Sequence, residues 1–170
     1  MAGTTPRKKK TVKQLLAEAQ RAVRTVPICT RADLVDEFEL LESRITKAKE
    51  AAGDSLAGAD TAAMEARLAV LKEEMADASI TFKIRALPDR EFTKLVAEHP
   101  GRKGNKADEL LGMNIDEVVE QLIKRGTVEP EMDGGDWEQL LGEVLNRATY
   151  EQLTNAAWSV NKQDVSVPFS

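Results

Sequence analysis

The chain has 170 residues, a hydrophobic content of 42% and few aromatic residues, so Leu, Val, Ile and Ala must build most of its core. Its single cysteine, Cys29, excludes an internal disulfide. The sequence has neither a recognisable secretory signal nor an apolar run of the roughly 18 residues that cross a bilayer. We therefore expect a soluble, intracellular protein that is rich in helix.

The net charge of −5 is distributed unevenly along the chain. Residues 1–30 carry seven Lys or Arg against a single acid, Glu18, whereas residues 31–170 carry 17 cations against 28 acids. A basic end of this kind is typical of a nucleic-acid arm, of a contact with an acidic partner, or of a solvated terminus. We predict a flexible basic arm at residues 1–10, where apolar side chains are scarce.

Helical spacing dominates the first half of the chain. Apolar residues three and four apart predict a helix from Thr11 to Val26, ended by Pro27. Two stripes with sustained 4-3 spacing then predict a helical hairpin over residues 31–78, divided by the Gly- and Asp-containing segment 51–60. The stripe residues are Leu34, Phe38, Leu41, Ile45, Ala48 and Ala52 on the first arm, and Met64, Leu68, Leu71, Met75 and Ala78 on the second.

The pattern changes to period two after the hairpin. Ile80, Phe82, Ile84 and Ala86 alternate with polar residues, which predicts a half-buried strand. A strand needs a partner for its backbone N–H and C=O groups. Residues 26–29 and 165–169 both qualify, and a neighbouring subunit is a third source.

From Leu87 onward, short apolar clusters predict a series of helices. Three of the helix starts carry a capping pair with three-residue spacing: Asn114 with Glu117, Asp136 with Gln139, and Thr149 with Gln152. The predicted fold is therefore mainly α. The N-terminal helix and helical hairpin occupy residues 11–78, and a multi-helix C-terminal domain with at most one small β pairing occupies residues 79–170.

One basic loop has the form of a phosphate-binding motif. Gly101-Arg102-Lys103-Gly104 fits the Gly-x-x-Gly loop of KH domains, which clamps a nucleic-acid backbone. Its flanks, Pro100 and Ala107, and its acidic surroundings do not fit. We interpret the loop as a solvated turn whose glycines permit positive φ. A nucleic-acid-binding module that uses this loop and the basic arm remains an alternative.

No constellation for chemistry is evident in the sequence. His99 and Cys29 are of the types that form a nucleophile and base pair, but nothing places them together, and His99 suits the C-terminal end of a helix. The acidic cluster at residues 129–138 lacks the spacing of a calcium loop. We therefore predict no catalytic residue, no cofactor, no metal site and no enzymatic activity.

Apolar surfaces are the remaining candidates for function. Trp residues often anchor protein partners, although core packing is the favoured role for both of those in this chain. The predicted helix faces give a candidate partner-binding set of Phe92, Leu95, Trp137, Leu141 and Trp158.

Three segments between Ile80 and Ser170 carry a family resemblance: "ITFKIRALPDREFTKLVAEHP", "MNIDEVVEQLI" and "DWEQLLGEVLNRATYEQLTNAAWSVN". Their marks are the strand that leads into Leu87-Pro88, the Glu98-His99-Pro100 helix end, the Asp136-Trp137 helix start, and Asn155-Ala156-Ala157 followed by Asn161. This part of the chain resembles the tail assembly chaperones of long-tailed, siphovirus-type phages, especially those of actinobacteria. The hairpin at residues 31–78 is not part of that pattern.

The resemblance implies a non-enzymatic protein of the host cytoplasm. Such a chaperone binds the long helical tape measure protein, keeps it soluble and helps to recruit tail tube subunits, and it is commonly made in two lengths by programmed ribosomal frameshifting. Association between copies of the chain, as a homo-oligomer, is compatible with this role. A structural or scaffold protein of the virion, built through the hairpin, is a further alternative.

Overall fold

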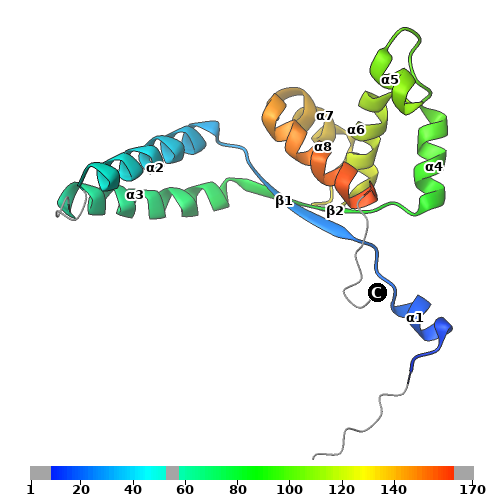
Figure 1. The fold of residues 1–170 in the computed structure, drawn as a ribbon, viewed down its shortest axis with the longest axis horizontal. Coiled ribbons are helices and arrows are strands. Elements are labelled where there is room, and N and C mark those ends of the chain that lie inside the picture. Colours follow the sequence, from blue (N-terminus) through cyan, green and yellow to red (C-terminus); the bar gives the residue numbers. More distant parts are fainter. Residues whose placement is uncertain (1–8, 53–57, 163–170) are drawn as a thin grey trace, which may run out of the picture.

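A computed structural model describes residues 9–52 and 58–162 of the chain (Figure 1). This part is mostly helical and contains a small antiparallel sheet. In chain order the elements are α1 (Val12–Glu18), β1 (Val23–Cys29), α2 (Ala32–Ala52), α3 (Gly58–Asp77), β2 (Ser79–Arg85), α4 (Asp89–Glu98), α5 (Lys106–Leu111), α6 (Ile115–Gly126), β3 (Thr127–Glu129), α7 (Gly134–Gln139), the π-helical turn η1 (Leu140–Val144) and α8 (Arg147–Lys162).

The sheet has the order β1-β2-β3. The predicted strand is confirmed as β2, and its partner β1 contains the candidate segment 26–29. The two strands pair from Val23 opposite Arg85 to Cys29 opposite Ser79. Pro27 is tolerated because β1 is an edge strand, where a missing N–H donor can face away from the ladder. The other candidate strand, 165–169, and most of the predicted basic arm lie outside the described residues.

Two predictions about this region are wrong. The helix expected over residues 11–26 ends at Glu18, because β-branched Val23, Thr25 and Val26 extend along β2 and satisfy its backbone groups. The sheet also has a second pairing, since β3 adds to the free side of β2 with Thr127 opposite Ile84. Three residues are too few to show an alternating pattern.

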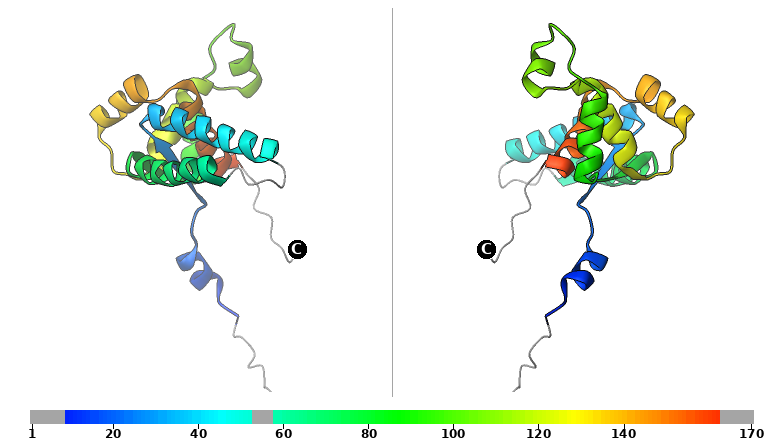
Figure 2. Two further views of the ribbon diagram at one scale, coloured as in Figure 1. Left: turned by 90° about the vertical axis from the view of Figure 1, so that its left-hand side faces the viewer. Right: turned by 90° about the vertical axis from the view of Figure 1, so that its right-hand side faces the viewer.

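Helices α6 and α8 cover one face of the sheet, and α4 and α5 pack beside α6 (Figures 1 and 2). The main core lies between these helices and the strands. Phe82 and Ile84 of β2 meet Leu122 of α6 and Leu153 of α8, and all four are fully buried. Trp137 of α7 completes the core with its ring centroid 6.3 Å from that of Phe82.

The predicted helical hairpin is confirmed as α2 and α3, which extend away from the main core (Figure 1). The described stripe residues from Leu34 to Ala48 and from Met64 to Ala78 are all buried or half-buried. Arg67 of α3 links the arms through two hydrogen bonds to Glu37 of α2, at 2.8 and 2.9 Å. The hairpin therefore has an apolar seam of its own.

Two helix starts lie about three residues before the predicted positions. Asp133, rather than Asp136, caps α7, and each of these two side chains accepts a hydrogen bond from the other's backbone N–H, at 2.9 and 3.0 Å. Asn146, rather than Thr149, caps α8. Successive capping residues are available in both segments, and the earlier one is used. The predicted cap of α6 by Asn114 is confirmed.

Gly126 allows α6 to turn directly into β3 against the sheet. A Cβ atom at this position would lie 2.9 Å from Ile84 Cγ2 and 3.1 Å from the Arg85 carbonyl oxygen. We predict that Gly126→Ala destabilises the fold by about 1 to 3 kcal/mol, because a fully buried residue and a strand must shift. Gly142→Ala is the matched control, since nothing lies within 4 Å of its Cβ position. Urea unfolding followed by circular dichroism measures both, and equal midpoints would contradict the prediction.

Candidate functional site

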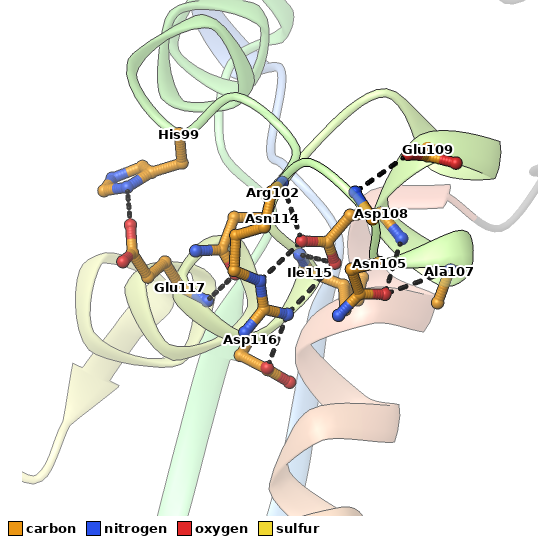
Figure 3. Close-up of polar contacts among 11 residues, drawn as sticks. His99, Arg102, Asn105, Ala107, Asp108, Glu109, Asn114, Ile115, Asp116 and Glu117 are labelled. Carbon is orange, nitrogen blue, oxygen red and sulfur yellow. Dashed lines mark hydrogen bonds and ion pairs between the residues drawn. The ribbon is translucent and has the colours of Figure 1, made fainter.

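The basic loop at residues 101–104 is tied into the domain through a buried carboxylate (Figure 3). Asp108 of α5 is fully buried, and its Oδ2 accepts hydrogen bonds from the backbone N–H and Nε of Arg102, at 3.0 and 2.6 Å. Arg102 Nη2 also donates to Asp108 Oδ1 and to Asp116 Oδ2, at 3.1 and 2.8 Å. Two carboxylates thus neutralise the guanidinium that a phosphate clamp would use.

The two glycines of this loop have different roles. Gly104 has a φ of +82°, as predicted for a turn glycine, whereas Gly101 does not have positive φ. Gly101 is needed for space instead, because its Cβ would lie 3.1 Å from the Asp108 carbonyl oxygen. The loop is therefore shaped by its contact with α5.

His99 and Cys29 do not form a site. His99 caps the C-terminal end of α4, and its Nδ1 lies 2.6 Å from Glu117 Oε2 of α6. Cys29 ends β1 and donates a weak hydrogen bond from Sγ to the Arg31 carbonyl oxygen, at 3.6 Å. The end of α4 and the end of β1 that leads into α2 lie on opposite sides of the molecule (Figure 1).

A concave, mainly apolar feature of the described residues is a groove with a volume of about 430 Å³. It lies where the base of the hairpin meets the segment from β3 to η1, and we call it the apolar groove. Its lining residues are Thr30, Ile80, Pro130, Met132, Asp136, Gln139, Leu140 and Val144.

A π-helical turn forms one wall of the apolar groove. Leu140 is almost completely buried, whereas Val144 is 41% exposed, and the turn closes with a 2.9 Å hydrogen bond from Leu145 N–H to the Leu140 carbonyl oxygen. Single π-helical turns are rare and often occur at functional sites. A π-helical turn is wider than an α-helical turn. The side chains that face outward in this turn therefore differ from those that an α-helical period predicts.

The segment that lines one side of the apolar groove is acidic, and we call its carboxylates the acidic rim, although only Asp136 among them lines the groove itself. The segment from Thr127 to Asn146 contains no Lys or Arg, and its acids are Glu129, Glu131, Asp133, Asp136, Glu138 and Glu143. Lys83 of β2 offsets Glu129 through a 2.7 Å ion pair, but the other carboxylates have no cationic neighbour within their own segment. Within residues 9–52 and 58–162, no cluster of His, Cys, Asp and Glu has the arrangement of a metal site.

The predicted partner-binding residues occupy different environments. Leu95 and Trp137 lie within the main core, where a partner cannot reach them without opening the fold. Phe92 and Trp158 are half-buried neighbours with ring centroids 6.5 Å apart, and Lys162 lies over both rings. Leu141 is half-buried within η1. None of these five residues lines the apolar groove.

The residues that do line the groove were not predicted to share a site. The alternating pattern predicts a strand that contains Ile80, and Leu140 and Val144 are predicted to lie on one helix that starts at Asp136, but neither prediction brings these residues together with Met132. The acidic cluster at residues 129–138 marks the region, but it was considered only as a calcium site and rejected because its spacing does not fit one. The signal that could have located the groove is the combination of a cation-free acidic segment with interspersed Pro, Met, Leu and Val.

The segments that carry the family resemblance contact one another in the fold. The Asn161 side chain of α8 accepts a 2.8 Å hydrogen bond from Leu87 N–H, next to Pro88. The His99 carbonyl oxygen accepts one from Asn114 N–H, at 2.9 Å. The marks of the resemblance therefore hold the scaffold together rather than form a ligand site.

No protein family, curated protein or solved structure matches the chain in the comparisons with known proteins. None of the helices in the described part of the chain is long and apolar enough to span a membrane.

The Asp108 carboxylate supplies a prediction about pH. Hydrogen bonds from Arg102 hold the pKa of Asp108 well below its usual range despite burial. The carboxylate thus stabilises the fold above the unfolded-state pKa of about 3.9, and this contribution is lost as the pH falls further. We predict that Asp108→Asn lowers the urea midpoint strongly at pH 7, and that this effect becomes progressively smaller as the pH falls below about 3.9. Asp116→Asn, at the exposed partner of the same arginine, is the control and has a small effect throughout this pH range.

Proposed function

We propose that the chain is a non-enzymatic assembly chaperone that binds an amphipathic helix of a long helical partner in the apolar groove. The groove is the observation that carries the proposal. Ile80, Met132, Leu140 and Val144 offer apolar contacts, and neighbouring turns of a bound helix would present side chains to them at i, i+3 and i+4 spacing. Met132 adds an adaptable contact, because its unbranched side chain fits irregular surfaces.

The acidic rim supplies selectivity. Carboxylates around an apolar groove repel acidic segments and favour helices with Lys or Arg beside the apolar stripe. The excess negative charge of residues 31–170 also keeps a complex soluble while the partner is unassembled. These are properties required of a chaperone that covers apolar helical surface temporarily.

The family resemblance supports the identity of the partner. In this proposal the client is the tape measure protein of a siphovirus-type tail, and the complex forms in the host cytoplasm before tail tube subunits assemble around the client. The positions that carry the resemblance build the scaffold on which the groove lies. The neutralisation of Arg102 removes the main support for the alternative of a nucleic-acid clamp.

Co-expression with the tape measure protein tests this function. We expect the wild-type chain to keep the client soluble and to co-purify with it. Val144→Asp places a charge in the apolar groove and should weaken the complex at least about tenfold, which corresponds to about 1.4 kcal/mol.

Leu110→Asp is the matched control, because Leu110 is 85% exposed, belongs to α5 and does not line the groove. Binding measured by calorimetry or interferometry with a client fragment compares the two variants. Failure of the wild-type chain to bind the client, or equal losses for Val144→Asp and Leu110→Asp, would refute the proposal.

A further inference from the structure

Helix α1 has an apolar face that no other residue of ranges 9–52 and 58–162 covers. Val12, Leu15 and Leu16 are 71%, 53% and 71% exposed, and no residue of α1 is buried. Figures 1 and 2 show α1 apart from the sheet and from every other helix. A capping box between Thr11 and Gln14 fixes its start. Isolated helices of seven residues are marginal in water, so this helix gains stability from a surface on which to pack.

The attachment of α1 keeps it away from the apolar groove of its own copy. Arg21 Nη1 donates a 2.8 Å hydrogen bond to the Ala86 carbonyl oxygen, and Ala86 N–H donates one of 2.9 Å to the Ala22 carbonyl oxygen. These contacts hold the chain beside the Arg85 end of β2, and they leave only Ala19 and Gln20 as a free connection. Three virtual bonds span at most about 11 Å.

The groove lies at the other end of the same strand pair. Its residues Thr30 and Ile80 flank the pairing of Cys29 with Ser79, whereas α1 emerges at the pairing of Val23 with Arg85. A seven-residue strand is about 20 Å long from first to last residue. The free connection is therefore too short for α1 to turn back and lie in its own groove.

The segment around α1 and the segment that lines the apolar groove carry opposite charges. Residues 7–13, at the start of α1, contain five of the seven cations of residues 1–30: Arg7, Lys8, Lys9, Lys10 and Lys13. The groove is bordered by the cation-free acidic segment from Thr127 to Asn146. An apolar helix in a basic segment thus matches an apolar groove in an acidic segment.

We propose that α1 of one copy docks in the apolar groove of a second copy. Leu15 and Leu16 enter the groove against Met132, Leu140 and Val144, and the lysines of the arm lie near the rim carboxylates. The contact joins two different surfaces, so it is head-to-tail and can close into a reciprocal pair or continue through further copies. The inference rests on the groove and not on the identity of the client.

The docked helix also regulates the groove. A seven-residue helix buries far less surface than a standard protein interface, so the contact is weak and reversible, and salt weakens its electrostatic part. A client helix that covers more of the groove displaces α1. The chain thereby protects its own apolar surfaces until the client is present.

Sedimentation velocity of the full chain without any client tests the inference. We expect the wild-type chain to associate reversibly and more weakly as salt rises. Leu15→Ser/Leu16→Ser and, separately, Val144→Lys should each weaken association at least about tenfold. Leu40→Ser/Val70→Ser is the matched control, since these two hairpin residues are 52% and 45% exposed, and it should associate like the wild type. Removal of the α1 leucines cannot unfold the domain, because they have no buried contact.

Cross-linking identifies the two surfaces directly. In a Cys29→Ser background, chains with Leu16→Cys are mixed with chains that carry Val144→Cys, and disulfide-linked heterodimers are measured by mass spectrometry. Heterodimers should form faster than in a mixture of Leu40→Cys with Val144→Cys.

A wild-type chain that is monomeric at every concentration, or association unaffected by Leu15→Ser/Leu16→Ser, would overturn the inference. Neither outcome affects the client-binding test, which uses the groove variant and the client.

Discussion

The antiparallel pairing of β1 with β2 is the constraint on which the rest of the structure depends. The two strands flank the helical hairpin in the sequence, so their pairing brings the two hairpin arms together at the base. Thr30 extends the ladder into the hairpin, because its N–H and hydroxyl both donate to the Ala78 carbonyl oxygen at 2.9 Å. The same pairing presents Phe82 and Ile84 of β2 to the helices of the C-terminal half. Hairpin, sheet and main core are therefore consequences of one register.

The register also separates the two surfaces that matter for function. At the Cys29–Ser79 end, the base of the hairpin and the turn η1 enclose the apolar groove. At the Val23–Arg85 end, the hydrogen bonds of Arg21 and Ala22 direct α1 away from the sheet. An exposed apolar helix and an apolar groove thus lie at opposite ends of the strand pair, and this separation is the reason we propose that they meet between molecules rather than within one.

Sequence patterns predicted the elements whose stabilising contacts are local or strictly periodic. The 4-3 stripes located the hairpin seam, the alternation of residues 80–86 located β2, and Asn114 located the start of α6. The sequence did not reveal features that depend on tertiary contacts. Residues 23–26 suit a helical stripe as well as a strand, and only the unpaired backbone of β2 decides between them. Gly126 permits β3 by its proximity to Ile84, which no sequence spacing indicates.

The candidate site was the least predictable part for the same reason. The π-helical turn at Leu140–Val144 breaks the period on which helix-face predictions rely, so Leu141 was chosen and Val144 was missed. The loop at residues 101–104 was correctly expected to be a turn, but no sequence pattern indicated that Arg102 pairs with Asp108, a buried carboxylate six positions further along the chain. Both cases depend on which side chains the fold brings together.

The central claim is that a helical client occupies the apolar groove, and hydrogen exchange with and without the tape measure protein tests it most directly. The account predicts slower amide exchange on binding in the segment from Thr127 to Asn146 and around Ile80, with little change in the loop at residues 101–104. Protection confined to the hairpin α2–α3, or to the loop, with none at the groove, would contradict the account.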